Sequence, residues 1–133
     1  MISLLYRAAD AVRRRTLRGD HGRIGEDLAH RYLRSHGCTV VARNYRPRGG
    51  SGEIDLVAWH SGRLLFIEVK TRGSANFGAP EAAVDQEKRE NLRYAARDYA
   101  RRTNIEWPRT RFDIVSIVLE TPTKIEWIRD AFR

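Results

Sequence analysis

The sequence predicts one α/β domain in which helices flank a β-sheet. Two amphipathic helical segments alternate with short runs of β-branched and aliphatic residues, and breaks rich in Gly or Pro separate them. The 133 residues suit a single domain, and 41% hydrophobic residues suffice for a core without disulfides, since Cys38 is the only cysteine. The expected order is helix, three strands, helix, then one or two strands.

Caps, breakers and residue alternation set the bounds of these elements. Asp20 is a suitable N-cap and Gly37 a suitable stop for the first helix. The runs on either side of HSGR (60–63) are typical of a hairpin, and Pro108 and Pro122 bracket a strand that reads as buried on both faces. The expected elements are a helix at 20–37, strands at 38–46, 53–59 and 64–70, a helix from about Glu81 to Arg102, strands at 112–119 and 124–128, and a tail at 130–133.

The charge balance favours an anionic partner. Lys and Arg number 25 against 17 Asp and Glu, which gives a formal net charge of +8. Half of this excess lies in residues 1–18, which we expect to form a basic N-terminal arm or helix ahead of a folded domain at 19–133. Such charge attracts phosphates at long range and indicates nucleic acid, although an arginine bias of the genome would produce the same balance.

Two observations concern the compartment. The apolar stretches are shorter than the ~18 residues that a membrane span needs, and the N-terminus has an apolar segment before its arginines, the reverse of a secretory signal. A lone cysteine also suits a reducing environment. We therefore expect a cytoplasmic protein with no membrane partner.

Charged residues interrupt the two apolar strands of the predicted hairpin. If the turn is symmetric about Ser61–Gly62, Asp55 lies opposite Glu68, and Glu53 lies opposite Lys70. Two carboxylates about 5 Å apart repel by roughly 3 kcal/mol at an effective dielectric constant near 20. A cation, a shared proton or Lys70 must therefore compensate, whereas a three-residue turn would shift the register and separate the two acids.

Strand alternation places the acids and the lysine together. Asp55, Glu68 and Lys70 share one face, while the other face is apolar and comprises Ile54, Leu56, Ala58, Leu65, Ile67 and Val69. Carboxylate oxygens suit Mg²⁺ or Mn²⁺, and a neighbouring lysine suits an activated water or a developing phosphate charge, as in metal-assisted phosphodiester hydrolysis. Glu26, at the edge of the apolar arc of the first helix, is a third candidate ligand. In that position it would equally stabilise the N-terminus of the helix.

Several segments carry a family resemblance. They are GE at 25–26, RNYR at 43–46, GEIDLVA at 52–58, FIEVKTR at 66–72, FGAPEAAV at 77–84 and RFDIVSI at 111–117. Together they resemble the YraN-like family of small bacterial proteins within the PD-(D/E)XK nuclease superfamily, close in layout to archaeal Holliday-junction resolvases. The resemblance implies a nuclease-like domain at 19–133 with a restriction-endonuclease-like core, a central mixed β-sheet flanked by helices in the order αβββαβ(β).

The resemblance also implies residue roles. Asp55, Glu68 and Glu26 would hold Mg²⁺ or Mn²⁺, and Lys70 would orient or activate the attacking water. The proline that often precedes the first acid is replaced here by Ile54. Glu53 is expected to pair with Lys70 and position it. The residues expected to contact nucleic acid are Arg43, Asn44, Arg46, Arg48, Arg72 and Lys88.

The expected function is a divalent-metal-dependent endonuclease that hydrolyses phosphodiester bonds in DNA, including branched or structured DNA. Likeness to resolvases adds a homodimer as an expectation. One alternative is a non-catalytic nucleic-acid-binding or assembly module that retains the nuclease fold. Another is a protein-interaction subunit that uses the basic arm. Metal-dependent turnover would separate the enzyme from both alternatives.

Overall fold

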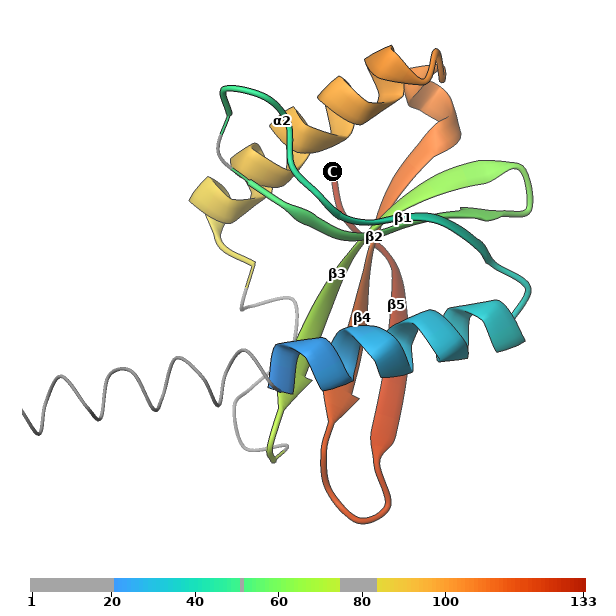
Figure 1. The fold of residues 1–133 in the computed structure, drawn as a ribbon, viewed down its shortest axis with the longest axis vertical. Coiled ribbons are helices and arrows are strands. Elements are labelled where there is room, and N and C mark those ends of the chain that lie inside the picture. The colour runs from blue at the N-terminus through green and yellow to red at the C-terminus, as the bar shows by residue number, and fades with distance from the viewer. Residues whose placement is uncertain (1–20, 51, 75–83) are drawn as a thin grey trace, which may run out of the picture.

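The computed structural model describes residues 21–50, 52–74 and 84–133, which form a mixed α/β fold (Figure 1). The arm expected at 1–18 lies outside this part of the chain. A first helix covers residues 21–35 of the described chain, and no described helix is long and apolar enough to cross a lipid bilayer. The other elements are β1 (Thr39–Tyr45), β2 (Ile54–His60), β3 (Arg63–Arg72), α2 (Gln86–Arg102), the 3₁₀ turn η2 (Trp107–Arg109), β4 (Thr110–Val118) and β5 (Lys124–Phe132).

The strands form one mixed sheet in the order β1-β2-β3-β4-β5. β1, β2 and β3 pair antiparallel, as do β4 and β5, whereas β3 and β4 are parallel. A parallel pair needs a crossover between its strands, and the segment containing α2 supplies it. The helix and strand order predicted from the sequence is confirmed, and so is a final strand.

A two-residue turn fixes the register of β2 against β3. Ser61 and Gly62 both have positive φ, 50° and 78°, as a tight hairpin turn requires. The pairing runs from His60↔Arg63 to Leu56↔Ile67, which confirms the register predicted from the sequence. Continued by one residue, this register brings Asp55 beside Glu68.

Two hydrophobic clusters lie on the two faces of the sheet. Under α2, the cluster includes Phe66, Phe112 and Leu92. Against the first helix, the cluster includes Leu33 and Ile67. Each helix therefore buries its apolar stripe on a different face of the sheet. Figure 1 shows the two helices on different sides of the strands. β4 contributes to both clusters, which confirms the strand predicted to be buried on both faces.

The position of Ile54 differs from the expectation. The alternation predicts that it shares a face with Leu56, yet it packs in the cluster under α2 together with its strand partner Tyr45. β1 contains an irregularity between Val40 and Ala42, and Asn44 has a φ of 52°. Such bulged geometry increases the local twist, so the start of β2 turns toward α2.

Two element boundaries also differ from the predictions. α2 begins at Gln86 and not near Glu81, because the Asp85 side chain caps it by accepting a 2.9 Å hydrogen bond from the Lys88 N–H. β5 extends to Phe132, so the tail expected at 130–133 is wrong. Phe132 pairs with Phe112 and stacks on it at 4.8 Å between ring centroids, which keeps the end of the strand on the sheet.

Candidate metal centre

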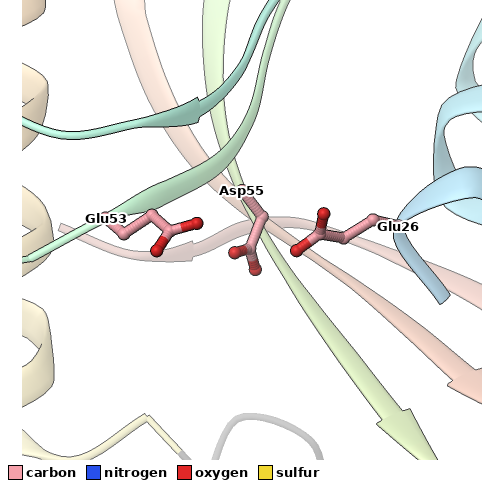
Figure 2. Close-up of side chains that lie close together, drawn as sticks. All are labelled: Glu26, Glu53 and Asp55. Carbon is pink, nitrogen blue, oxygen red and sulfur yellow. The ribbon is translucent and has the colours of Figure 1, made fainter. Parts of the chain in front are cut away.

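Three carboxylates converge where the first helix meets the start of β2. Glu26, Glu53 and Asp55 each offer an oxygen, and these oxygens all lie within 4.8 Å of one another. All three residues are partly buried. Figure 2 shows Asp55 between the other two, with Glu26 approaching from the helix. We call these three residues the carboxylate cluster.

Glycines let the backbone bring two members of this cluster together. A Cβ on Gly25 would lie 1.8 Å from the Thr71 side-chain oxygen, so the helix start can pack against the end of β3 only with glycine there. Gly52 has a φ of 112°, and its Cβ position is 2.7 Å from the Asn91 carbonyl oxygen on α2. Glu26 and Glu53 therefore follow glycines that permit close approach.

Asp55 is the most strongly perturbed carboxyl group of the site. Its Oδ2 accepts a 2.8 Å hydrogen bond from the Val69 N–H. The pKa of Asp55 is raised from 3.8 to about 8, mainly by burial and next by the neighbouring Glu68 carboxylate, while the Val69 hydrogen bond opposes the rise. Glu26 and Glu53 make smaller contributions to the same rise. Without a cation, Asp55 therefore holds a proton at neutral pH.

Glu68 is buried and lies between two lysines. Its Oε1 is 2.5 Å from the Lys88 Nζ and 3.4 Å from the Lys70 Nζ. Burial lowers the pKa of Lys70, and the adjacent Lys88 lowers it further, against the attraction of Glu68. Burial also acts against the charge of Lys88, but the Glu68 carboxylate outweighs it and the pKa of Lys88 is raised. Lys70 is therefore the lysine that more readily loses its proton.

Basic and amide side chains from β1 and the loop after it contact the carboxylate cluster. Arg43 lies 2.9 Å from Asp27 and 3.6 Å from Glu26. The Asn44 amide nitrogen, in the orientation that satisfies its neighbours, lies 2.7 Å from a Glu53 oxygen and 3.2 Å from both Glu26 oxygens. These contacts hold the acids in place.

Glu53 occupies a different position from the one expected. Its Oε2 accepts hydrogen bonds from Arg46 at 2.8 and 3.1 Å, so the ion pair expected with Lys70 is wrong. Glu53 joins the carboxylate cluster because it stands two residues before Asp55, and residues two apart in an extended chain point the same way. That spacing was visible in the sequence.

The expected nucleic-acid contacts divide into two groups. Arg43, Asn44, Arg46 and Lys88 contact carboxylates of the site. Arg48 is exposed in the loop after β1, and Arg72 ends β3, where its carbonyl accepts a hydrogen bond from Leu119. Contact of any of these residues with nucleic acid stays a prediction.

Comparison with known proteins identifies the family. A model of the uncharacterised protein family UPF0102 matches residues 25–117. The chain belongs to the UPF0102 family. A UPF0102 protein of Solibacter usitatus is 67% identical over 132 residues, covering 99% of this chain and 100% of that protein. UPF0102 proteins of Koribacter versatilis and Rhodococcus opacus are 47% and 42% identical, covering 84% of this chain and 78% and 94% of their own lengths. The predicted YraN-like family is confirmed.

The donor set of this UPF0102 protein fits a hard divalent cation. Mg²⁺ binds oxygens at about 2.1 Å, so two ligands on opposite sides of the ion are about 4.2 Å apart. The three oxygens of the carboxylate cluster lie within 4.8 Å of one another, so small side-chain movements would let one ion contact all three. A cation would also favour the ionised form of Asp55, whose burial and acidic neighbours now disfavour it.

Proposed function

We propose that this UPF0102 protein is a divalent-metal-dependent endonuclease that hydrolyses phosphodiester bonds in DNA, with a restriction-endonuclease-like core of the PD-(D/E)XK superfamily. One observation carries the proposal: Asp55 in the carboxylate cluster and the Glu68–Lys70 pair on β3 come together at one site. The net charge of +8 supports an anionic substrate.

The acids would hold the cation. Asp55 and Glu26 of the carboxylate cluster are proposed ligands together with Glu68 on β3, which lies outside the cluster but acts on the Asp55 carboxyl group. Glu53 of the cluster can join them. Both ion pairs of Glu68 among the described residues use Oε1, so we expect Oε2 to face the ion. Mg²⁺ or Mn²⁺ bound there would supply Lewis-acid polarisation of the scissile phosphate.

The two lysines would have different roles in the reaction. Lys70, whose pKa is lowered, can take the proton of the attacking water when it is neutral. Lys88, whose pKa is raised, keeps its charge, holds Glu68 and faces the negative charge that develops on the phosphate. The expected contacts of Arg48 and Arg72 with the DNA backbone would orient the strand.

A cleavage panel tests the proposal. Wild type, Asp55→Ala and Lys70→Ala are incubated with linear, flapped and four-way-junction DNA, and with RNA, in Mg²⁺ or Mn²⁺. We expect wild type to cut DNA and both variants to lose at least about 100-fold in rate. Glu126→Ala, at an exposed position on β5, serves as the control and should keep full activity. Cutting that survives both site substitutions would reject the assigned roles.

A non-catalytic DNA-binding module is the second candidate. The ion pairs of Glu26 with Arg43, of Glu53 with Arg46 and of Glu68 with Lys88 favour it, because they offset acidic charge without a cation. This candidate predicts salt-sensitive DNA binding with no metal-dependent turnover. Calorimetric titration of Mn²⁺ into wild type and Asp55→Asn separates the two, since only the nuclease requires binding that depends on Asp55.

A further inference from the structure

A groove of about 450 Å³ lies at the opposite end of β3 from Glu68. Arginines and aromatic rings dominate its lining, and the only carboxylate among its lining residues is Asp130. Four of the lining residues come from the start of β3, the middle of α2 and η2. They are Arg63 on β3, Arg93 and Arg97 on α2, and Trp107 on η2.

Two of these arginines carry uncompensated charge. Neither Arg63 nor Arg97 has a carboxylate partner among the described residues, and both are exposed. Arg111, by contrast, forms an ion pair with Asp113, with 2.8 Å between Nε and Oδ1. Arg133 pairs with Asp130, with 3.7 Å between nitrogen and oxygen. Arg93 donates a hydrogen bond to the main-chain oxygen of Arg133, so Arg63 and Arg97 are the exposed groove arginines that neither a carboxylate nor a main-chain oxygen engages among the described residues.

Neighbouring groups hold the α2 arginines over the groove. The Arg97 guanidinium lies 4.3 Å from the centre of the Trp107 ring, a cation–π contact that fixes its plane. Arg93, one helical turn earlier, donates a hydrogen bond to the main-chain oxygen of Arg133. Residues four apart on a helix are separated by about 6 Å along its axis, so the α2 arginines form a short row.

The distance to the carboxylate site suits a long ligand. Arg63 precedes Glu68 by five residues on β3, and a strand rises about 3.3 Å per residue, so the two positions are roughly 17 Å apart. DNA rises about 3.4 Å per base pair. One duplex arm could therefore reach both places across about five base pairs.

We propose that Arg63 and Arg97, with Trp107 beside them, form a phosphate-binding groove that holds a DNA arm about five base pairs from the carboxylate site. Guanidinium forks match phosphate geometry, and the Trp107 ring holds one of them in place through its cation–π contact with Arg97. The concave shape favours a nucleic-acid backbone over a flat lipid surface. This inference rests on the proposed function, because it takes DNA to be the substrate.

A metal-free binding experiment tests the groove. Fluorescence anisotropy with a labelled 20-base-pair duplex, in EDTA, compares wild type with the double variant Arg63→Gln/Arg97→Gln. Two lost phosphate contacts should weaken binding about 10-fold or more and reduce the slope of log K against log salt by about 1.8. The matched control is Arg31→Gln/Arg34→Gln, which removes the same charge from exposed positions on the first helix and should change binding less than about threefold.

The outcomes separate the groove from the nuclease. An equal loss in both double variants, or no loss in the groove variant, overturns the inference. A specific loss without metal-dependent cutting by wild type supports the groove and counts against the nuclease. Selective loss of binding to anionic vesicles or to polyglutamate, with DNA binding intact, assigns the groove to another partner and overturns the inference.

Folding is controlled in the same series. Circular dichroism and thermal melts of each variant report the fold. If the groove double variant does not fold, Arg63→Gln alone answers the question, because this exposed side chain has no ion pair or ring contact among the described residues. Arg63→Lys/Arg97→Lys, which retains the charge, should restore most of the binding.

Discussion

Two aspartates on this sheet, Asp113 and the partly buried Asp55, have opposite surroundings. Asp113 on β4 is fully buried and completely satisfied: Arg111 donates two hydrogen bonds of 2.8 Å, and Trp127 and the Asp130 N–H donate at 2.8 and 3.0 Å. Asp55 on β2 accepts one hydrogen bond, from Val69, and faces other acids.

The surroundings of the two aspartates indicate a structural role for Asp113 and a ligand-binding role for Asp55. Asp113 accepts hydrogen bonds from three groups, the Arg111 guanidinium, the Trp127 indole and the Asp130 N–H, so its carboxyl group is part of the fold. Asp55 has no ion pair of its own among the described residues, and burial together with Glu68 raises its pKa to about 8. A carboxylate kept at such a cost to the fold is expected to serve a ligand, here a cation.

The largest expected effect is on Asp113. Asp113→Asn should lower the free energy of unfolding by about 3 kcal/mol, because it leaves the partly buried Arg111 guanidinium without its ion-pair partner. Urea denaturation measures this loss. The same change at an exposed acid, Glu126→Gln, should cost less than about 0.5 kcal/mol. If Asp113→Asn were equally harmless, the distinction between the two aspartates would fail.

The second-largest expected effect is the gain in stability when a metal ion binds. Mn²⁺ at 100 times its dissociation constant should stabilise wild type by about 2.7 kcal/mol, since only the folded chain assembles the carboxylate cluster. Thermal melts with and without the ion measure this gain. Asp55→Asn should lose most of it, whereas an equal gain in that variant would place the ion elsewhere.

The pH dependence of stability that Asp55 causes is a smaller effect. Asp55→Asn should raise the free energy of unfolding at high pH, whereas Asp113→Asn should lower it. As pH rises from about 4 to about 8, the unfolded chain releases the Asp55 proton while the folded protein retains it, so the metal-free wild type loses stability. Asp55→Asn removes this loss and should be more stable than wild type at pH 8, on the order of 2 kcal/mol, with little difference at pH 4. Urea midpoints in EDTA across this range provide the measurement. A variant less stable than wild type at pH 8 would contradict the raised pKa.

The smallest effect concerns the lysine pair. Lys88 lowers the pKa of Lys70, so Lys88→Gln should move the Lys70 pKa upward. An NMR titration of the Lys70 side chain follows this change directly. Lys124→Gln, far along the chain on β5 with an exposed side chain, should leave the Lys70 pKa unchanged.

The sequence predicted most of the fold because its patterns were local. Alternation in 54–60 and 63–72 identified the hairpin, and the symmetric turn at Ser61–Gly62 gave its register. The end of β5 could not be predicted, because Phe132 stays on the sheet through contact with Phe112, twenty residues earlier in the chain. The swing of Ile54 toward α2 likewise depends on irregular pairing with β1.

The sequence predicted that Asp55, Glu68 and Lys70 lie close together, but not the contacts that surround them, and their roles stay a prediction. Asp55, Glu68 and Lys70 follow from the strand pattern, and Glu26 from the family resemblance. The pairing of Glu53 with Arg46 depends on how the loop after β1 folds back, which has no periodic signal. The contact of Lys88 with Glu68 needs the packing angle of α2 on the sheet, a tertiary property.

The two-residue turn at Ser61–Gly62 sets the register that brings Asp55 beside Glu68 at the other end of the hairpin. One added residue there would exchange the two sides of β3 relative to β2, sending Glu68 and Lys70 under the first helix while Asp55 stayed behind. The fold could absorb that slip by repacking apolar residues, but the reacting groups could not. We therefore expect an insertion at this tip to separate Asp55 from Glu68.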